Sequence, residues 1–219
     1  METLRAVTGT LLPGPPQDPD PGAVEARCAE ALDMLLGAFT FDPPLIYGGG
    51  PWSKRADGAR DEMARFVPLD ELQVLGWRIR LEGSRGLAER EFAGPVVGLQ
   101  TTYRRGLASV ENLAAARGGT FPQLPTTAQE AVLRMPMVSD FVGQVLSDSI
   151  NAMYGPPEYG GNRDLVGWRA IGWPGDVQPR GYSDAEVQDL DPGASPLPYT
   201  AARMRIVAAR VLPGIRIVD

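Results

Sequence analysis

Apolar residues recur every three or four positions in several stretches of this 219-residue chain, and proline or glycine interrupts each stretch. Such spacing places the apolar side chains on one face of an α-helix, and proline and glycine are residues at which helices end. We find no sustained alternation of apolar and polar residues, the pattern typical of β-strands, and no repeat of roughly 20–50 residues. The pattern therefore predicts a mostly α-helical fold whose long ordered loops are rich in proline and glycine.

Several helix boundaries carry their own signals. Asp20 can cap a helix whose apolar stripe starts at Val24, and the sequence Thr127–Glu130 matches a capping box that opens a short helix. Ser139 can cap the helix that follows this short one, and Gly118-Gly119 closes the helix that precedes it, over residues 99–114. The predicted helical segments cover residues 4–12, 24–39, 69–81, 99–114, a short run from 127, 139–153 and 200–212.

Charge and hydropathy exclude two classes of partner. The formal net charge is −6 at pH 7, which argues against binding to nucleic acid or to an anionic membrane surface. No apolar run approaches the ~20 residues that span a bilayer, so direct membrane insertion is not expected. Neither nucleic acid nor a membrane is therefore an expected partner.

The chain contains no histidine and a single cysteine. A Ser-His-Asp or Cys-His nucleophile is thereby excluded, as is a Cys-x-x-Cys-His haem site, and zinc sites usually need histidine or several cysteines. No G-x-G-x-x-G sequence indicates a dinucleotide site, and Cys28 lies on the apolar stripe of its predicted helix. We therefore expect no catalytic residue, no metal site and no cofactor-binding residue in this chain, and a buried thiol at Cys28.

Residues 154–182 form the most unusual segment, with seven glycines, four prolines, two tryptophans, three tyrosines and three arginines. Such a segment can pack onto its own domain, with Arg163 bonded to backbone carbonyls and Trp168 and Trp173 covering helix ends. It can also face a partner, because interfaces concentrate energy in Trp, Tyr and Arg. Both interpretations stay open here. The predicted partner-binding residues are Tyr159, Asn162, Arg163, Trp168, Trp173, Arg180 and Tyr182.

The sequence of this segment also predicts features of its backbone conformation. Gly160-Gly161 and Asn162 tolerate left-handed dihedral angles, and Asp164 can cap a short helix that carries Trp168 and Ile171.

A family resemblance rests on the same segment. The sequence Tyr159–Asp164, followed by Val166-Gly167-Trp168, Ile171-Gly172 and Pro174-Gly175, resembles the signature of the gluconate 2-dehydrogenase subunit 3 family. The resemblance implies one helical domain over residues 1–219, with residues 42–98 as an atypical insert and residues 183–219 as a C-terminal extension.

The resemblance implies a non-catalytic accessory (gamma-type) subunit. The expected partner is the large subunit of an FAD-dependent glucose-methanol-choline-type dehydrogenase that oxidises a sugar, sugar acid or alcohol, so FAD is expected in the partner and no cofactor in this chain. One alternative is a freestanding helical protein-interaction module without a dehydrogenase partner. Another is a small enzyme using Asp, Glu or Tyr.

The start of the chain departs from that family, whose members often begin with a twin-arginine export signal. The sequence from Met1 lacks a basic start with an apolar centre, and the Arg104-Arg105 pair lies deep in a predicted helix. A cytoplasmic location is therefore expected, although export with a partner that carries a signal stays open.

Overall fold

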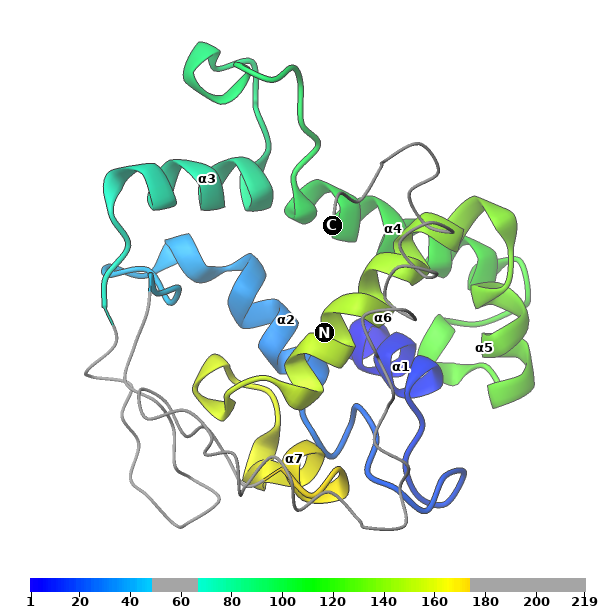
Figure 1. Ribbon diagram of the computed structural model, residues 1–219. Helices are drawn as coiled ribbons and strands as arrows, with labels where there is room; N and C mark the ends of the chain where they lie inside the picture. Colours follow the sequence, from blue (N-terminus) through cyan, green and yellow to red (C-terminus); the bar gives the residue numbers. More distant parts are fainter. Residues whose placement is uncertain (49–66, 174–219) are drawn as a thin grey trace, which may run out of the picture. The chain divides into compact units, whose positions relative to one another are not determined.

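The structure, a computed structural model, describes residues 1–48 and 67–173, which lie within one compact unit spanning residues 1–176. In this part of the chain there are seven α-helices and no β-strand, so the predicted mostly α-helical fold is confirmed (Figure 1). None of the helices in these ranges is long and apolar enough to cross a bilayer. The helices are α1 (Glu2–Leu11), α2 (Cys28–Leu36), α3 (Glu71–Glu82), α4 (Leu99–Ala115), α5 (Thr126–Leu133), α6 (Ser139–Tyr154) and α7 (Val166–Ala170).

The main hydrophobic core lies among α1, α2, α4, α5 and α6. Val7 of α1, Val110 of α4 and Val145 of α6 are fully buried in it, as their helical spacing predicts. Phe121, in the 3-10 turn Phe121–Gln123 that leads from α4 to α5, is also fully buried. Helix α1 is therefore part of the folded core rather than an appendage at the start of the chain.

Helices α4 and α6 approach closely at Gly106. A Cβ atom at this position would overlap the ring of Phe141, which belongs to α6. The same ring stacks edge-on against Tyr103, with 5.7 Å between the ring centroids. Glycine at position 106 is thus required by the packing of two helices and not by its backbone conformation.

Helix α3 is attached through a second cluster in which Ala38, Ile46 and Leu81 are buried. It packs along α4, so the described part of the 42–98 segment belongs to the same compact unit as the main core. The prediction of one domain over residues 1–219 is not tested further, because the 183–219 extension lies outside the described residues, as does the predicted helix at 200–212.

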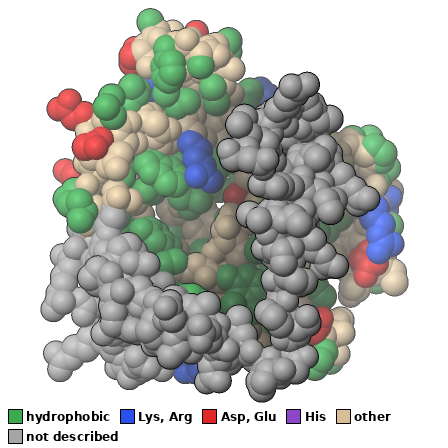
Figure 2. All heavy atoms as spheres, viewed as in Figure 1, with side chains coloured by type: hydrophobic (Ala, Val, Ile, Leu, Met, Phe, Trp, Pro, Cys, Tyr) green, Lys and Arg blue, Asp and Glu red, His purple; other side chains and the backbone are tan. Residues whose placement is uncertain are grey.

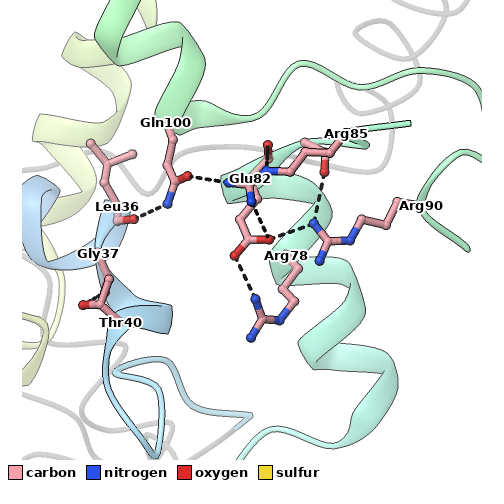
Figure 3. Close-up of polar contacts among 9 residues, drawn as sticks. Leu36, Gly37, Thr40, Arg78, Glu82, Arg85, Arg90 and Gln100 are labelled. Carbon is pink, nitrogen blue, oxygen red and sulfur yellow. Dashed lines mark hydrogen bonds and ion pairs between the residues drawn. The ribbon is translucent and has the colours of Figure 1, made fainter. Parts of the chain in front are cut away.

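Glu82 ties the end of α3 to the loop that follows (Figure 3). Its carboxylate accepts hydrogen bonds from Arg78 at 2.8 Å and from Arg90 at 2.7 Å, and Arg85 lies 3.9 Å away. Gln100 accepts from Arg85 and donates to the carbonyl of Leu36, which links this network to the end of α2. Burial raises the pKa of the Glu82 carboxyl, but the hydrogen bond from Arg90 and the nearby guanidinium charges outweigh it and hold that pKa below its ordinary value.

We expect this network to lose its stabilising effect in acid. Because the folded-state pKa of Glu82 is depressed, its contribution to stability is fully present above the unfolded-state pKa of about 4.3 and is lost as pH falls through the folded-state value. Glu82→Gln should therefore lower the free energy of unfolding at pH 7, and the difference from wild type should shrink below pH ~4. Urea unfolding at several pH values measures this, and a difference that stays constant with pH would contradict the assignment.

Three predicted helix boundaries are wrong. Helix α2 begins at Cys28, and Val24 is 63% exposed in a turn before it, because the backbone N–H of Ala23 bonds to the carbonyl of Leu12 and holds the chain against α1. Asp20 consequently caps no helix. The Thr127 capping box is absent, since α5 begins at Thr126 after Pro125, and Ser139 is the first residue of α6 rather than its cap.

A capping box that the sequence analysis did not identify does form at Asp70. Its side chain accepts from the backbone of Gln73, whose side chain bonds back to the backbone N–H of Asp70. The predicted helix over 69–81 therefore starts with its own cap, two residues later than expected.

Candidate partner-binding site and the adjoining cavity

The segment after α6 folds back over that helix around Asn162. The side chain of Asn162 is fully buried, and its Oδ1 accepts hydrogen bonds from the backbone N–H groups of Gly167 (3.0 Å) and Trp168 (3.4 Å). Its Nδ2 donates to the carbonyl of Gly155 at 3.0 Å. Asn162 and Gly160 both have positive φ angles, +46° and +88°, as their residue types predicted, whereas Gly161, for which the same was expected, does not. One amide side chain thus closes the loop at both ends.

Two glycines let this loop lie directly on the last turn of α6. A Cβ atom at Gly161 would overlap the carbonyl oxygen of Ala152, and one at Gly167 would overlap that of Met153. The clashing atoms belong to the helix backbone, which cannot rotate away as a side chain could. The glycine-rich composition therefore serves close packing of loop against helix.

Trp168 covers the end of α6, as the internal-packing interpretation expects. Its side chain is 3% exposed, and its Nε1 donates to the carbonyl of Tyr154, the last residue of α6, at 2.8 Å. That carbonyl belongs to the last turn of the helix, whose four final C=O groups lack a partner within the helix.

The bonding partner of Arg163 and the role of Asp164 both differ from what the sequence predicted. The guanidinium of Arg163 pairs with the carboxylate of Asp164 at 3.3 Å and with no backbone carbonyl of the described residues, and both side chains are exposed. Asp164 does not cap α7, because its own backbone is left-handed, with φ +53°, and the residue before α7 is Leu165. This exposed ion pair contributes little to fold stability.

The structure separates the seven predicted partner-binding residues into groups. Asn162 and Trp168 are buried inside the chain, Tyr159 is half-buried, and Arg163 and Trp173 are exposed. Ile171, next to α7, is 58% exposed, although it was not among the predicted residues. Arg180 and Tyr182 lie outside the described residues. Partner binding by any of the seven stays a prediction.

A cavity of about 310 Å³ opens beside this loop, between α2, α3 and α6. Figure 2 shows a hollow on this face with hydrophobic side chains around it. Asp148 is the acidic residue among its walls, and Arg80 is the basic one. The apolar and aromatic residues that line it are Ala31, Leu32, Met34, Leu35, Leu45, Ile46, Tyr47, Trp77, Ala152, Pro156 and Tyr159.

Asp148 is held in place by two donors. Its side chain is 5% exposed, and its Oδ2 accepts from the hydroxyl of Tyr103 at 2.7 Å and from Gln144 at 2.9 Å. Burial raises the pKa of Tyr103, with a further contribution from Asp148, so the phenol remains protonated and donates. The sequence analysis missed this site, and its one signal was an aspartate one turn beyond the buried Val145 of α6.

The single cysteine of the chain is Cys28. As predicted it is buried, and its thiol donates to the carbonyl of Ser149 at 3.4 Å. Burial, together with the charge of Glu30, raises the pKa of the thiol to about 12, so it is not a thiolate at neutral pH. Residues 1–48 and 67–173 contain no group of three or more Cys, Asp or Glu placed to hold a metal ion.

Comparison with known proteins gives one clear match. The family model described as gluconate 2-dehydrogenase subunit 3 matches residues 1–175, which covers α1 to α7 and the loop closed by Asn162. No curated protein and no solved structure matches the chain significantly. With four-fifths of its length matched, this chain belongs to the gluconate 2-dehydrogenase subunit 3 family.

Proposed function

We propose that this chain is a non-catalytic accessory subunit that binds and stabilises an FAD-dependent dehydrogenase of the glucose-methanol-choline type. The partner carries the flavin and oxidises a sugar, sugar acid or alcohol, while this chain holds no cofactor. The family match over residues 1–175 is the observation that carries the proposal, because the family is defined as a dehydrogenase subunit. The absence of histidine from the sequence supports a role in binding rather than in acid-base chemistry.

The exposed end of the loop after α6 is the proposed docking surface. Arg163, Ile171 and Trp173 are exposed there, next to the buried Asn162 and Trp168 that fix the loop. A loop that is already ordered loses less conformational entropy on binding than a mobile one. The arrangement thus separates residues that hold the loop from residues that can meet a partner.

Trp173→Ala is expected to weaken binding of the flavoprotein by about 2 kcal/mol, or about 30-fold in Kd, and to lower the melting temperature less than Trp168→Ala does. Arg163→Ala should act in the same direction with a smaller effect, because its ion pair is solvated. Titration of each purified variant with the flavoprotein measures Kd, and thermal unfolding measures the fold.

Phe92→Ala is the matched control, because Phe92 is an aromatic residue that is 82% exposed in the loop between α3 and α4. It should leave Kd unchanged. If Phe92→Ala weakens binding and Trp173→Ala does not, the partner contacts the loop at 83–98 and the docking surface is misplaced.

We also propose that the chain stays in the cytoplasm when it is expressed without its partner. Residues 2–11 form α1, whose Leu4 and Val7 are buried in the main core, so this segment serves the fold. Cell fractionation beside an exported control protein tests the proposal, and recovery of the chain outside the cytoplasm would contradict it.

A further inference from the structure

We propose that the cavity between α2, α3 and α6 is a binding site for a small organic ammonium compound with an apolar body, its ammonium group meeting Asp148. The proposal goes beyond the accessory role, because it assigns a small-molecule ligand to this chain itself. It rests on the geometry of one carboxylate and on the walls around it.

Asp148 supplies the polar anchor. Both of its donors, Tyr103 and Gln144, bond to the same oxygen, Oδ2. The other oxygen, Oδ1, accepts no hydrogen bond from the described chain, although the residue is 95% buried and lines the cavity. A carboxylate oxygen accepts hydrogen bonds and cannot donate while ionised. At Asp148 the cavity therefore offers an acceptor that carries a negative charge.

A cationic donor suits this acceptor better than a neutral one. A charged group that is removed from water is stabilised when it meets an opposite charge, and hydrogen bonds between ionised partners are the stronger kind. Three aromatic residues, Tyr47, Trp77 and Tyr159, line the same space, and aromatic faces attract organic cations. An anionic ligand would bring like charge to Asp148 and is disfavoured.

The remaining walls set the size and polarity of the ligand body. Leu32, Leu35 and Ile46 are among the lining residues, so the space away from Asp148 is apolar. A volume of about 310 Å³ falls at the lower end of the range of roughly 300–1,000 Å³ that is usual for small-molecule sites. A single ring with a short alkyl chain fits this volume, and its apolar surface suits these walls better than a polyhydroxylated molecule does.

Arg80 limits what the outer end of the ligand can carry. It lines the cavity with an exposed side chain, and its guanidinium lies 4.9 Å from the centroid of the Trp77 ring. No ion pair joins it to a carboxylate among the described residues. The ligand therefore has one ammonium group, at its inner end, and a neutral or acidic outer end.

Three probes of one shape test the proposal: 3-phenylpropylamine, 3-phenylpropanol and 3-phenylpropionate. Calorimetric titration of the full chain should give binding in the order amine, alcohol, acid, with the amine at least about 10-fold tighter than the alcohol, a factor that corresponds to one good charged contact. The amine should also shift the NMR signal of the Trp77 indole N–H, which reports on the cavity in the unmodified protein.

Asp148→Asn should remove the preference for the amine, because the amide keeps the shape and loses the charge. Asp140→Asn is the matched control, since Asp140 is an exposed carboxylate at the start of the same helix and should leave the preference intact. Equal binding of amine and alcohol, tighter binding of the acid, or no shift of the Trp77 signal at millimolar amine would each overturn the proposal. The wild-type measurements decide the question even if Asp148→Asn does not fold.

Discussion

Trp168→Ala is expected to lower the free energy of unfolding by about 3–5 kcal/mol, the range for truncating a buried tryptophan. The indole is 3% exposed and bonds to the carbonyl of Tyr154. Its loss leaves a cavity beneath the loop and a carbonyl at the end of α6 without its partner. Urea unfolding followed by circular dichroism measures the effect.

Trp168→Phe is the control for this prediction. Phenylalanine retains much of the buried ring but cannot donate a hydrogen bond, so a loss of about 1–2 kcal/mol is expected. A loss of unfolding free energy below about 1 kcal/mol for Trp168→Ala would show that this residue does not hold the loop after α6. Truncation of a buried tryptophan normally lowers the free energy of unfolding several times more than that.

Gly106→Ala is expected to destabilise the protein by about 1–3 kcal/mol, although glycine to alanine within a helix usually stabilises by about 1 kcal/mol. The reason is the ring of Phe141, which occupies the space that a Cβ atom at position 106 needs. The overlap involves ring atoms close to the backbone of α6, so relief requires α4 and α6 to move apart.

The chain offers matched controls in two other helical glycines. At Gly76 in α3 and Gly143 in α6, no atom beyond the adjoining residues and the backbone of the same helix lies within 4 Å of the place that a Cβ would take. Replacement by alanine should therefore stabilise by about 0.5–1 kcal/mol. Chemical denaturation of the three variants gives the comparison. If Gly106→Ala also stabilises the protein, α4 and α6 do not approach each other as closely at position 106 as the structure has them.

Local sequence signals predicted the long helices well. Helices α4 and α6 follow the apolar spacing closely, because both bury one regular face. Gly155 caps α6, and Gly118 lies shortly after the end of α4 at Ala115. The start of α2 could not be predicted in the same way. It depends on the contact of Ala23 with Leu12, and a contact between two segments leaves no periodic pattern in either.

For the loop after α6 too, some features could be predicted from the sequence and others could not. Residue types alone predicted that Gly160, Gly161 and Asn162 tolerate left-handed backbone, and Gly160 and Asn162 adopt it. The place of Trp168 in a predicted short helix, and of Trp173 between Gly172 and Pro174, indicated a structural role for the first and a partner-facing role for the second. Trp168 is indeed buried by the end of α6, while Trp173 is 36% exposed only five residues later. The cavity could not be predicted in this way, since Tyr47, Trp77 and Asp148 come from three distant segments that only the tertiary fold brings together.

The most direct test of the accessory-subunit proposal is the flavin content of the native complex. The tagged chain, purified from cells that also express its dehydrogenase, should carry a flavoprotein whose FAD absorbance is bleached when a sugar, sugar acid or alcohol substrate is added. The chain expressed alone should be colourless. Stoichiometric flavin in the isolated chain, or a chain that is stable in those cells with no flavoprotein bound, would contradict the proposal.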